Sequence, residues 1–78
     1  MKEVKVFWED SKAYGNEWYD VEEVEHFDIV HCVSKGFIVQ EDKQKIKLAQ
    51  TFGGDCYLNF VIIPKGCITK LIVETDLT

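Results

Sequence analysis

Short runs of this sequence place apolar residues at every second position, and clusters of turn-forming residues separate the runs. A period of two is typical of a β-strand, whose successive side chains point to opposite faces of a sheet. Hairpin-length connections between such strands favour a small all-β fold. We predict five strands, over residues 2–8, 29–39, 45–50, 56–63 and 68–75. A chain of 78 residues has room for one domain, which we expect to cover residues 1–78.

A helical period is expected only between the first two predicted strands. Residues 9–17 form a polar loop, after which Val21, Val24 and Phe27 recur at helical spacing. Asp20 precedes them in the position of an N-cap, with an acidic residue three positions later. We therefore predict one short helix in an otherwise all-β chain.

Two further features concern how the strands are arranged. Gly36 interrupts the second strand, and a glycine within a strand pattern marks a bulge or a sharp bend. Residues 63–68 fit a single 3₁₀ turn between the last two strands. The resulting order is strand, long loop, bent strand, two hairpins, 3₁₀ turn and strand. It resembles the layout of SH3-like and Sm-like barrels, so we expect a small five-stranded barrel of this kind.

The charged residues are unevenly distributed. All nine basic residues are lysine, and fourteen acidic residues give a net charge of −5. Arginine most often clamps phosphate and reads guanine, so its absence from an acidic chain argues against binding to long nucleic acid. Segment 17–28 is acidic and contains no lysine, whereas lysines gather in segment 35–47. Such runs are often only solvated surface.

Membrane association is not expected either. The longest apolar run, at residues 60–63, falls far short of the roughly 18 residues that a spanning segment needs. The N-terminal residues alternate charged and apolar types and have no signal-peptide apolar core.

The cysteines and histidines are too few and too scattered for a metal site. Cys32, Cys56 and Cys67 are odd in number and form no CxxC pair, so we expect three free thiols, no disulfide and no zinc. Cys32 with His26 or His31 is the only candidate nucleophile and base, and no catalytic signature surrounds it. We therefore expect no enzymatic activity, no metal and no cofactor.

The last two predicted strands are apolar on both faces. A half-buried strand alternates apolar and polar residues, and one thin barrel has a single interior. Val61, Ile63, Leu71 and Val73 therefore cannot all enter one core, and we predict that they form the interface of a homo-oligomer. The alternative is that the short helix and the long loop cover the additional apolar face.

Several motifs together resemble a group of small phage and prophage proteins. They are Val6-x-Trp8-x-Asp10, Trp18-Tyr19-Asp20, and the segments 33–39, 46–51 and 63–68. The resemblance implies a virus-encoded β-barrel that acts in the cytoplasm of a bacterial host, with a role against host defence as one expectation. Some small phage β-proteins form oligomers that sequester nucleotide-type host signals, and others bind a host defence protein directly.

Our first hypothesis is a non-enzymatic homo-oligomer that binds and sequesters a nucleotide-type immune signal. Aromatic rings stack on bases, and lysines pair with phosphates. The candidate ligand-binding residues are Tyr14, Trp18, Tyr19, Lys43, Lys45 and Lys65. Trp8 is instead expected to complete the core.

The second hypothesis is a protein-interaction module. In that case the acidic segment 17–28 docks on a basic host protein and inhibits it. A ligand that copurifies favours the first hypothesis, and capture of a basic host protein favours the second.

Overall fold

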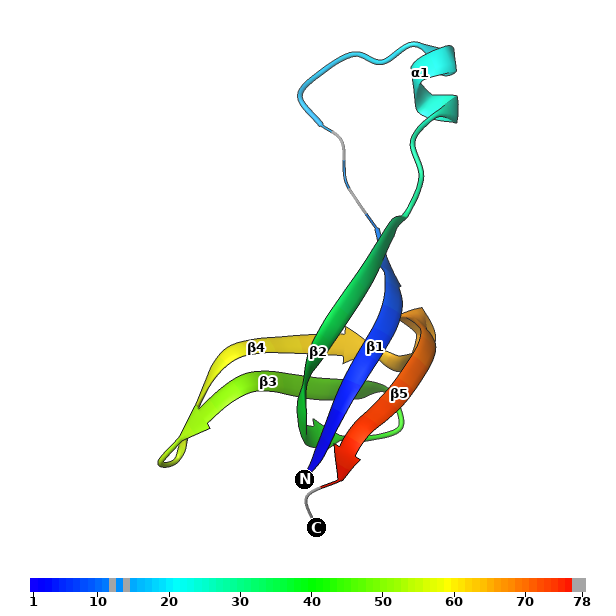
Figure 1. Cartoon of the computed structure of the whole chain (residues 1–78). Coiled ribbons are helices and arrows are strands. Elements are labelled where there is room, and N and C mark those ends of the chain that lie inside the picture. The colour runs from blue at the N-terminus through cyan, green and yellow to red at the C-terminus, as the bar shows by residue number, and fades with distance from the viewer. Residues whose placement is uncertain (12, 14, 77–78) are drawn as a thin grey trace.

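The computed structural model describes residues 1–11, 13 and 15–76 as five antiparallel strands in one sheet (Figure 1). The order across the sheet is β4-β3-β2-β1-β5. A short helix, α1, lies between β1 and β2, and a 3₁₀ turn, η1, joins β4 to β5. The elements are β1 (Lys2–Asp10), α1 (Val21–Glu25), β2 (Val30–Glu41), β3 (Lys45–Gly53), β4 (Cys56–Pro64), η1 (Lys65–Cys67) and β5 (Ile68–Asp76). The predicted all-β fold with one short helix and a 3₁₀ turn is confirmed.

The sheet is bent strongly but is not closed. β1, β2 and β5 lie side by side, while β3 and β4 run across them at a large angle (Figure 1). Within the described chain, β4 pairs only with β3 and β5 pairs only with β1, so these two strands are the free edges of the sheet. The coarse prediction of a five-stranded β-fold therefore holds, and the closed barrel is not seen.

Gly36 of β2 lies close against the backbone of β3. A β-carbon built at Gly36 would lie 2.8 Å from the carbonyl oxygen of Ala49. β2 runs without a break through Gly36, and its register shift lies between Ile38 and Gln40. The prediction was a bulge or a sharp bend at Gly36. The bulge lies a few residues further along, and the glycine itself allows the close approach of the two strands.

The core lies between the two halves of the bent sheet, one formed by β1, β2 and β5 and the other by β3 and β4. Its fully buried members are Val4, Val6, Ile46, Leu48 and Ile63. Trp8 packs against them, and its Nε1 donates a hydrogen bond of 2.9 Å to Ser34 Oγ. The expectation that Trp8 completes the core is confirmed. Each fully buried aliphatic side chain stabilises the fold by about 1.5–3 kcal/mol.

Three local predictions are corrected. Ile63 is completely buried in its own chain and has no surface left for a second copy. Asp20 stands at the N-cap of α1, but its side chain forms no capping hydrogen bond. The helix and the loop extend away from the sheet (Figure 1), so they do not cover its remaining apolar side chains.

Candidate functional site

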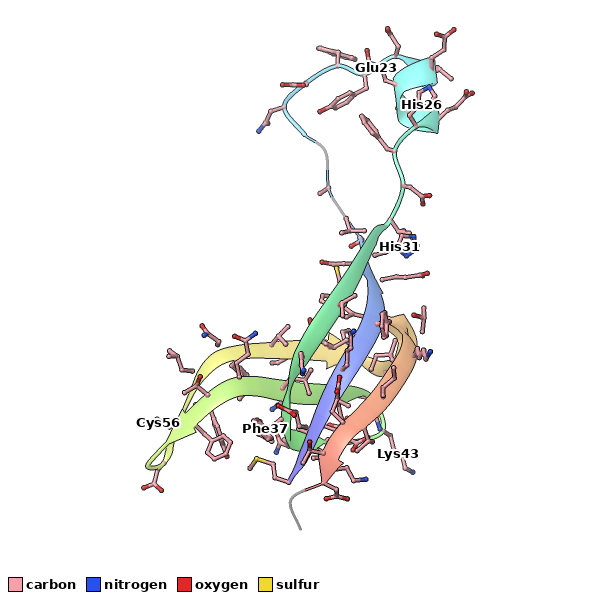
Figure 2. The ribbon with its side chains drawn as sticks, viewed as in Figure 1. Glu23, His26, His31, Phe37, Lys43 and Cys56 are labelled. Atoms are coloured by element: carbon pink, nitrogen blue, oxygen red, sulfur yellow. The ribbon has the colours of Figure 1, made fainter. Side chains whose placement is uncertain are left out.

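The most distinctive part of the surface is the connection between β1 and β2, residues 11–29, which we call the acidic arm. β1 and β2 remain paired up to Asp10 and Val30, so the arm begins directly at the end of a hydrogen-bonded strand pair. From there it projects beyond the sheet and ends in α1 (Figure 1). Figure 2 shows Glu23 and His26 at this far end. The arm contributes to a longest dimension of 52 Å for the molecule.

The tip of the arm is held by its own contacts. The amide of Val24 donates to the carbonyl oxygen of Asp20, and the amide of Phe27 donates to that of Val24, both at 3.1 Å. The rings of Tyr19 and Phe27 meet edge to face, with centroids 5.2 Å apart and planes at 87°. One helical turn and one aromatic pair therefore contribute to the shape of the tip.

The arm exposes both apolar and acidic side chains. Trp18 is fully exposed, and Val21 in α1 is 78% exposed. No ion pair among the described residues neutralises the acidic side chains of the arm. These side chains, all on exposed residues, are Glu17, Asp20, Glu22, Glu23, Glu25 and Asp28. Apolar contact area and net negative charge thus lie together on one projecting element.

The predicted stacking residues have different environments on this arm. Trp18 presents its indole to solvent. Tyr19 is half-buried and contacts Phe27, so its ring already shapes the tip. Tyr14 lies outside the described residues.

The predicted lysines lie at the β2–β3 turn and at η1. Lys45 Nζ lies 2.9 Å from Asp42 Oδ2, and Lys65 Nζ lies 2.8 Å from Glu41 Oε2. Lys43 is exposed in the turn between β2 and β3. Acidic partners thus offset the charge of two of these three candidate phosphate ligands.

Asp42 organises this turn. Its Oδ1 accepts hydrogen bonds from the backbone amides of Gln44 and Lys45, at 2.7 and 2.9 Å. The hydrogen bond from the Lys45 side chain, followed by these two amide bonds, lowers the pKa of Asp42 from 3.8 to about 2. Lys45 therefore has a clear structural role as the partner of Asp42.

The lysines and the aromatic residues of the first hypothesis lie at opposite ends of the folded molecule. β2 connects the arm to the lysine turn, and its 12 residues correspond to a span of about 35–40 Å. In Figure 2, Lys43 is far from Glu23 and His26 at the arm tip. A site that combines these lysines with Trp18 therefore needs more than one copy of the chain.

The suspected nucleophile and base are separated as well. Cys32 Sγ lies 3.8 Å from the carbonyl oxygen of Val30, while His31 Nδ1 lies 3.8 Å from Glu9 Oε1. Adjacent strand residues point to opposite faces, and His26 is on the arm beyond them. The three cysteines are free. No group of three or more metal-ligating side chains occurs among the described residues.

An open hollow of about 540 Å³ is lined by residues of β2, β3 and β4 and was not predicted. Its polar lining residues are Ser34, Lys35, Gln50 and Asn59, and its apolar ones are Val33, Leu48, Phe60 and Val61. Lys35 Nζ lies 3.9 Å from Glu74 Oε1. A sequence signal for this hollow was Asn59, a single polar residue within an apolar strand.

Searches against family models, curated proteins and solved structures found no match to this chain. No helix in the described part of the chain is long and apolar enough to cross a membrane. The fold and surface define a small open β-sheet protein with a projecting acidic arm.

Proposed function

We propose that the chain is a non-enzymatic protein-interaction module whose acidic arm binds a basic partner protein. The observation that supports this most strongly is the fully exposed Trp18 on a projecting acidic element, whose carboxylates form no ion pair among the described residues. Tryptophan is enriched among the residues that dominate interface energies. A partner that covers Trp18 and Val21 removes apolar surface from water, which favours binding.

The charge of the arm determines the kind of partner. Segment 17–28 of the arm carries six acidic side chains and no lysine, which creates a negative potential at its tip. Such a potential speeds association with a positively charged surface and disfavours acidic partners. A nucleic-acid-binding site on another protein has the complementary charge, so occupation by the arm would block it.

We base the proposed kind of partner on the sequence resemblance. Similarity to small phage and prophage proteins supports a host defence protein as the target and the bacterial cytoplasm as the place of action. The strand order and the 3₁₀ turn support a distant relation to SH3-like or Sm-like barrels. Sequestration of a nucleotide signal has less support, because Lys45 and Lys65 are already paired with acidic side chains.

Capture from a bacterial lysate tests the proposal if the arm is varied alone. The variant Glu22→Lys with Glu23→Lys reverses two charges on the arm. Its matched control, Asp55→Lys with Asp76→Lys, makes the same change in net charge at exposed positions away from the arm. We expect the wild type and the control to retain the same basic protein and the arm variant to lose it.

Trp18→Ala adds a test of the apolar contact. Loss of a central aromatic contact of about 2 kcal/mol weakens binding roughly thirtyfold. Equal retention of the captured protein by every variant would contradict the proposal. A copurifying nucleotide with no captured protein would favour the sequestration hypothesis instead.

A further inference from the structure

β4 is an edge strand that carries no charged residue. Free edges in stable monomers are interrupted by charged residues, proline or bulges, because their backbone groups otherwise recruit another strand. None of the nine residues of β4 is charged, and Pro64 stands only at its end. The backbone of β4 leaves the extended conformation at Asn59, whose φ is 57°. β5, the opposite edge, carries Lys70, Glu74 and Asp76. The two edges of this sheet therefore differ in their tendency to pair.

Exposed apolar side chains extend along β4. Tyr57, Leu58, Phe60 and Ile62 are between 47% and 62% exposed. At about 200 Å² for a large side chain, they offer on the order of 400 Å² of apolar surface. One side of a standard interface uses about 800 Å². The β4 side chains supply about half of this, and the backbone edge and the exposed Phe52 in β3 add to it.

We propose that β4 pairs antiparallel with β4 of a second copy, so that two sheets join across a two-fold axis. Full overlap of the two strands places Phe60 opposite Phe60 of the second copy. It also places Leu58 opposite Ile62 of that copy. Every contact along the seam is then between uncharged residues, and the backbone groups of both edges gain hydrogen-bonding partners.

The other edge fits β4 less well. When β4 and β5 overlap fully, in either direction, Lys70 and Glu74 fall opposite Leu58 and Ile62. That arrangement would bury charged side chains against apolar ones, which is costly. Pairing of β4 with β4 also ends at two copies. It uses the uncharged edge of both copies and leaves only the charged β5 edges free.

This inference is independent of the proposed role of the arm, and it narrows the interface predicted from the sequence. The joined strands include Val61 but leave Leu71 and Val73 outside the seam. The seam itself uses no residue of the acidic arm.

Solution mass tests the proposal directly. Light scattering should give twice the 9.1 kDa of one chain. Ile62→Lys places a charge in the seam and should weaken self-association at least about a hundredfold. Val73→Lys, the control on β5, should stay dimeric. A monomeric wild type, or dissociation by Val73→Lys with none by Ile62→Lys, would overturn the proposal.

Cross-linking identifies the seam without depending on a destabilising charge. In a chain whose native cysteines are replaced by serine, Phe60→Cys should form an intermolecular disulfide on mild oxidation. Directly opposite residues of an antiparallel pair have Cα atoms about 4.5–5.5 Å apart, which suits a disulfide. Ile72→Cys, at the centre of β5, should not cross-link. Linkage only in a mixture of the two variants would show β4–β5 pairing and refute the proposal.

Discussion

Substitution of Gly36 by alanine tests how tightly β2 is held against β3. The new methyl group would lie 2.8 Å from the carbonyl oxygen and 3.2 Å from the carbonyl carbon of Ala49. Neither strand is free to retreat, because Ala49 is fully buried and Gly36 pairs with the buried Val4 on its other side. Overpacking of this kind costs about 1–3 kcal/mol. A domain of this size has roughly 4–12 kcal/mol of stability in total, so the loss should be large.

Urea unfolding followed by the fluorescence of Trp8 and Trp18 measures this loss. We expect Gly36→Ala to destabilise the fold by about 2 kcal/mol, which corresponds to a melting temperature roughly 8–16 °C lower. Gly53→Ala is the matched control, because a β-carbon there has no neighbour within 4 Å. It should be neutral or slightly stabilising. If Gly36→Ala were as stable as the control, the close approach of β2 and β3 would be refuted.

Three further predictions follow from individual contacts. Ser34→Ala removes the acceptor of the Trp8 indole, so it should cost about 1–2 kcal/mol in urea unfolding, and no change would mean that water replaces the hydroxyl without loss. The pKa of Asp42 is lowered from 3.8 to about 2, so its contribution to stability is present above pH 3.8 and is lost as the pH falls through about 2. Asp42→Asn should therefore lower the unfolding midpoint at neutral pH and have no effect below pH 2, and a pH-independent effect would contradict the hydrogen-bonded carboxylate. The free thiols should make the melting temperature insensitive to reducing agent, and an intramolecular disulfide seen by mass spectrometry in fresh protein would contradict this.

The strands could be predicted because their signals are local. Alternating apolar residues located all five strands, and segment 63–68 located the 3₁₀ turn between the last two. The ends of the strands extend beyond the predicted ranges by up to three residues, because backbone pairing continues after the apolar pattern ends.

Long-range arrangement was the part that local patterns did not contain. Ile63 is in the core because β4 pairs with β3 in a register that sets it opposite the buried Ile46. The apolar pattern gives two candidate faces for β4 and does not show which one meets the core. Closure of a barrel likewise depends on the distance between two strand edges, which no single segment determines.

In the candidate site, too, features of a single segment could be predicted, and contacts between distant segments could not. The acidic arm was recognised from its composition, since charge and loop length are properties of one segment. The pair of Lys45 with Asp42 spans three residues, and the turn sequence could have indicated it. The pair of Lys65 with Glu41 joins distant segments and depends on the fold. For this reason, the lysine cluster looked more available for a ligand than it is.

The affinity of the captured partner at several salt concentrations tests the role of the acidic arm most directly. Screening weakens charge attraction but leaves apolar contact largely unchanged. We predict that Trp18→Ala weakens binding by a similar factor at every salt concentration. The Glu22→Lys and Glu23→Lys variant should lose most affinity at low salt. An affinity that neither variant changes at any salt concentration would contradict binding through the arm.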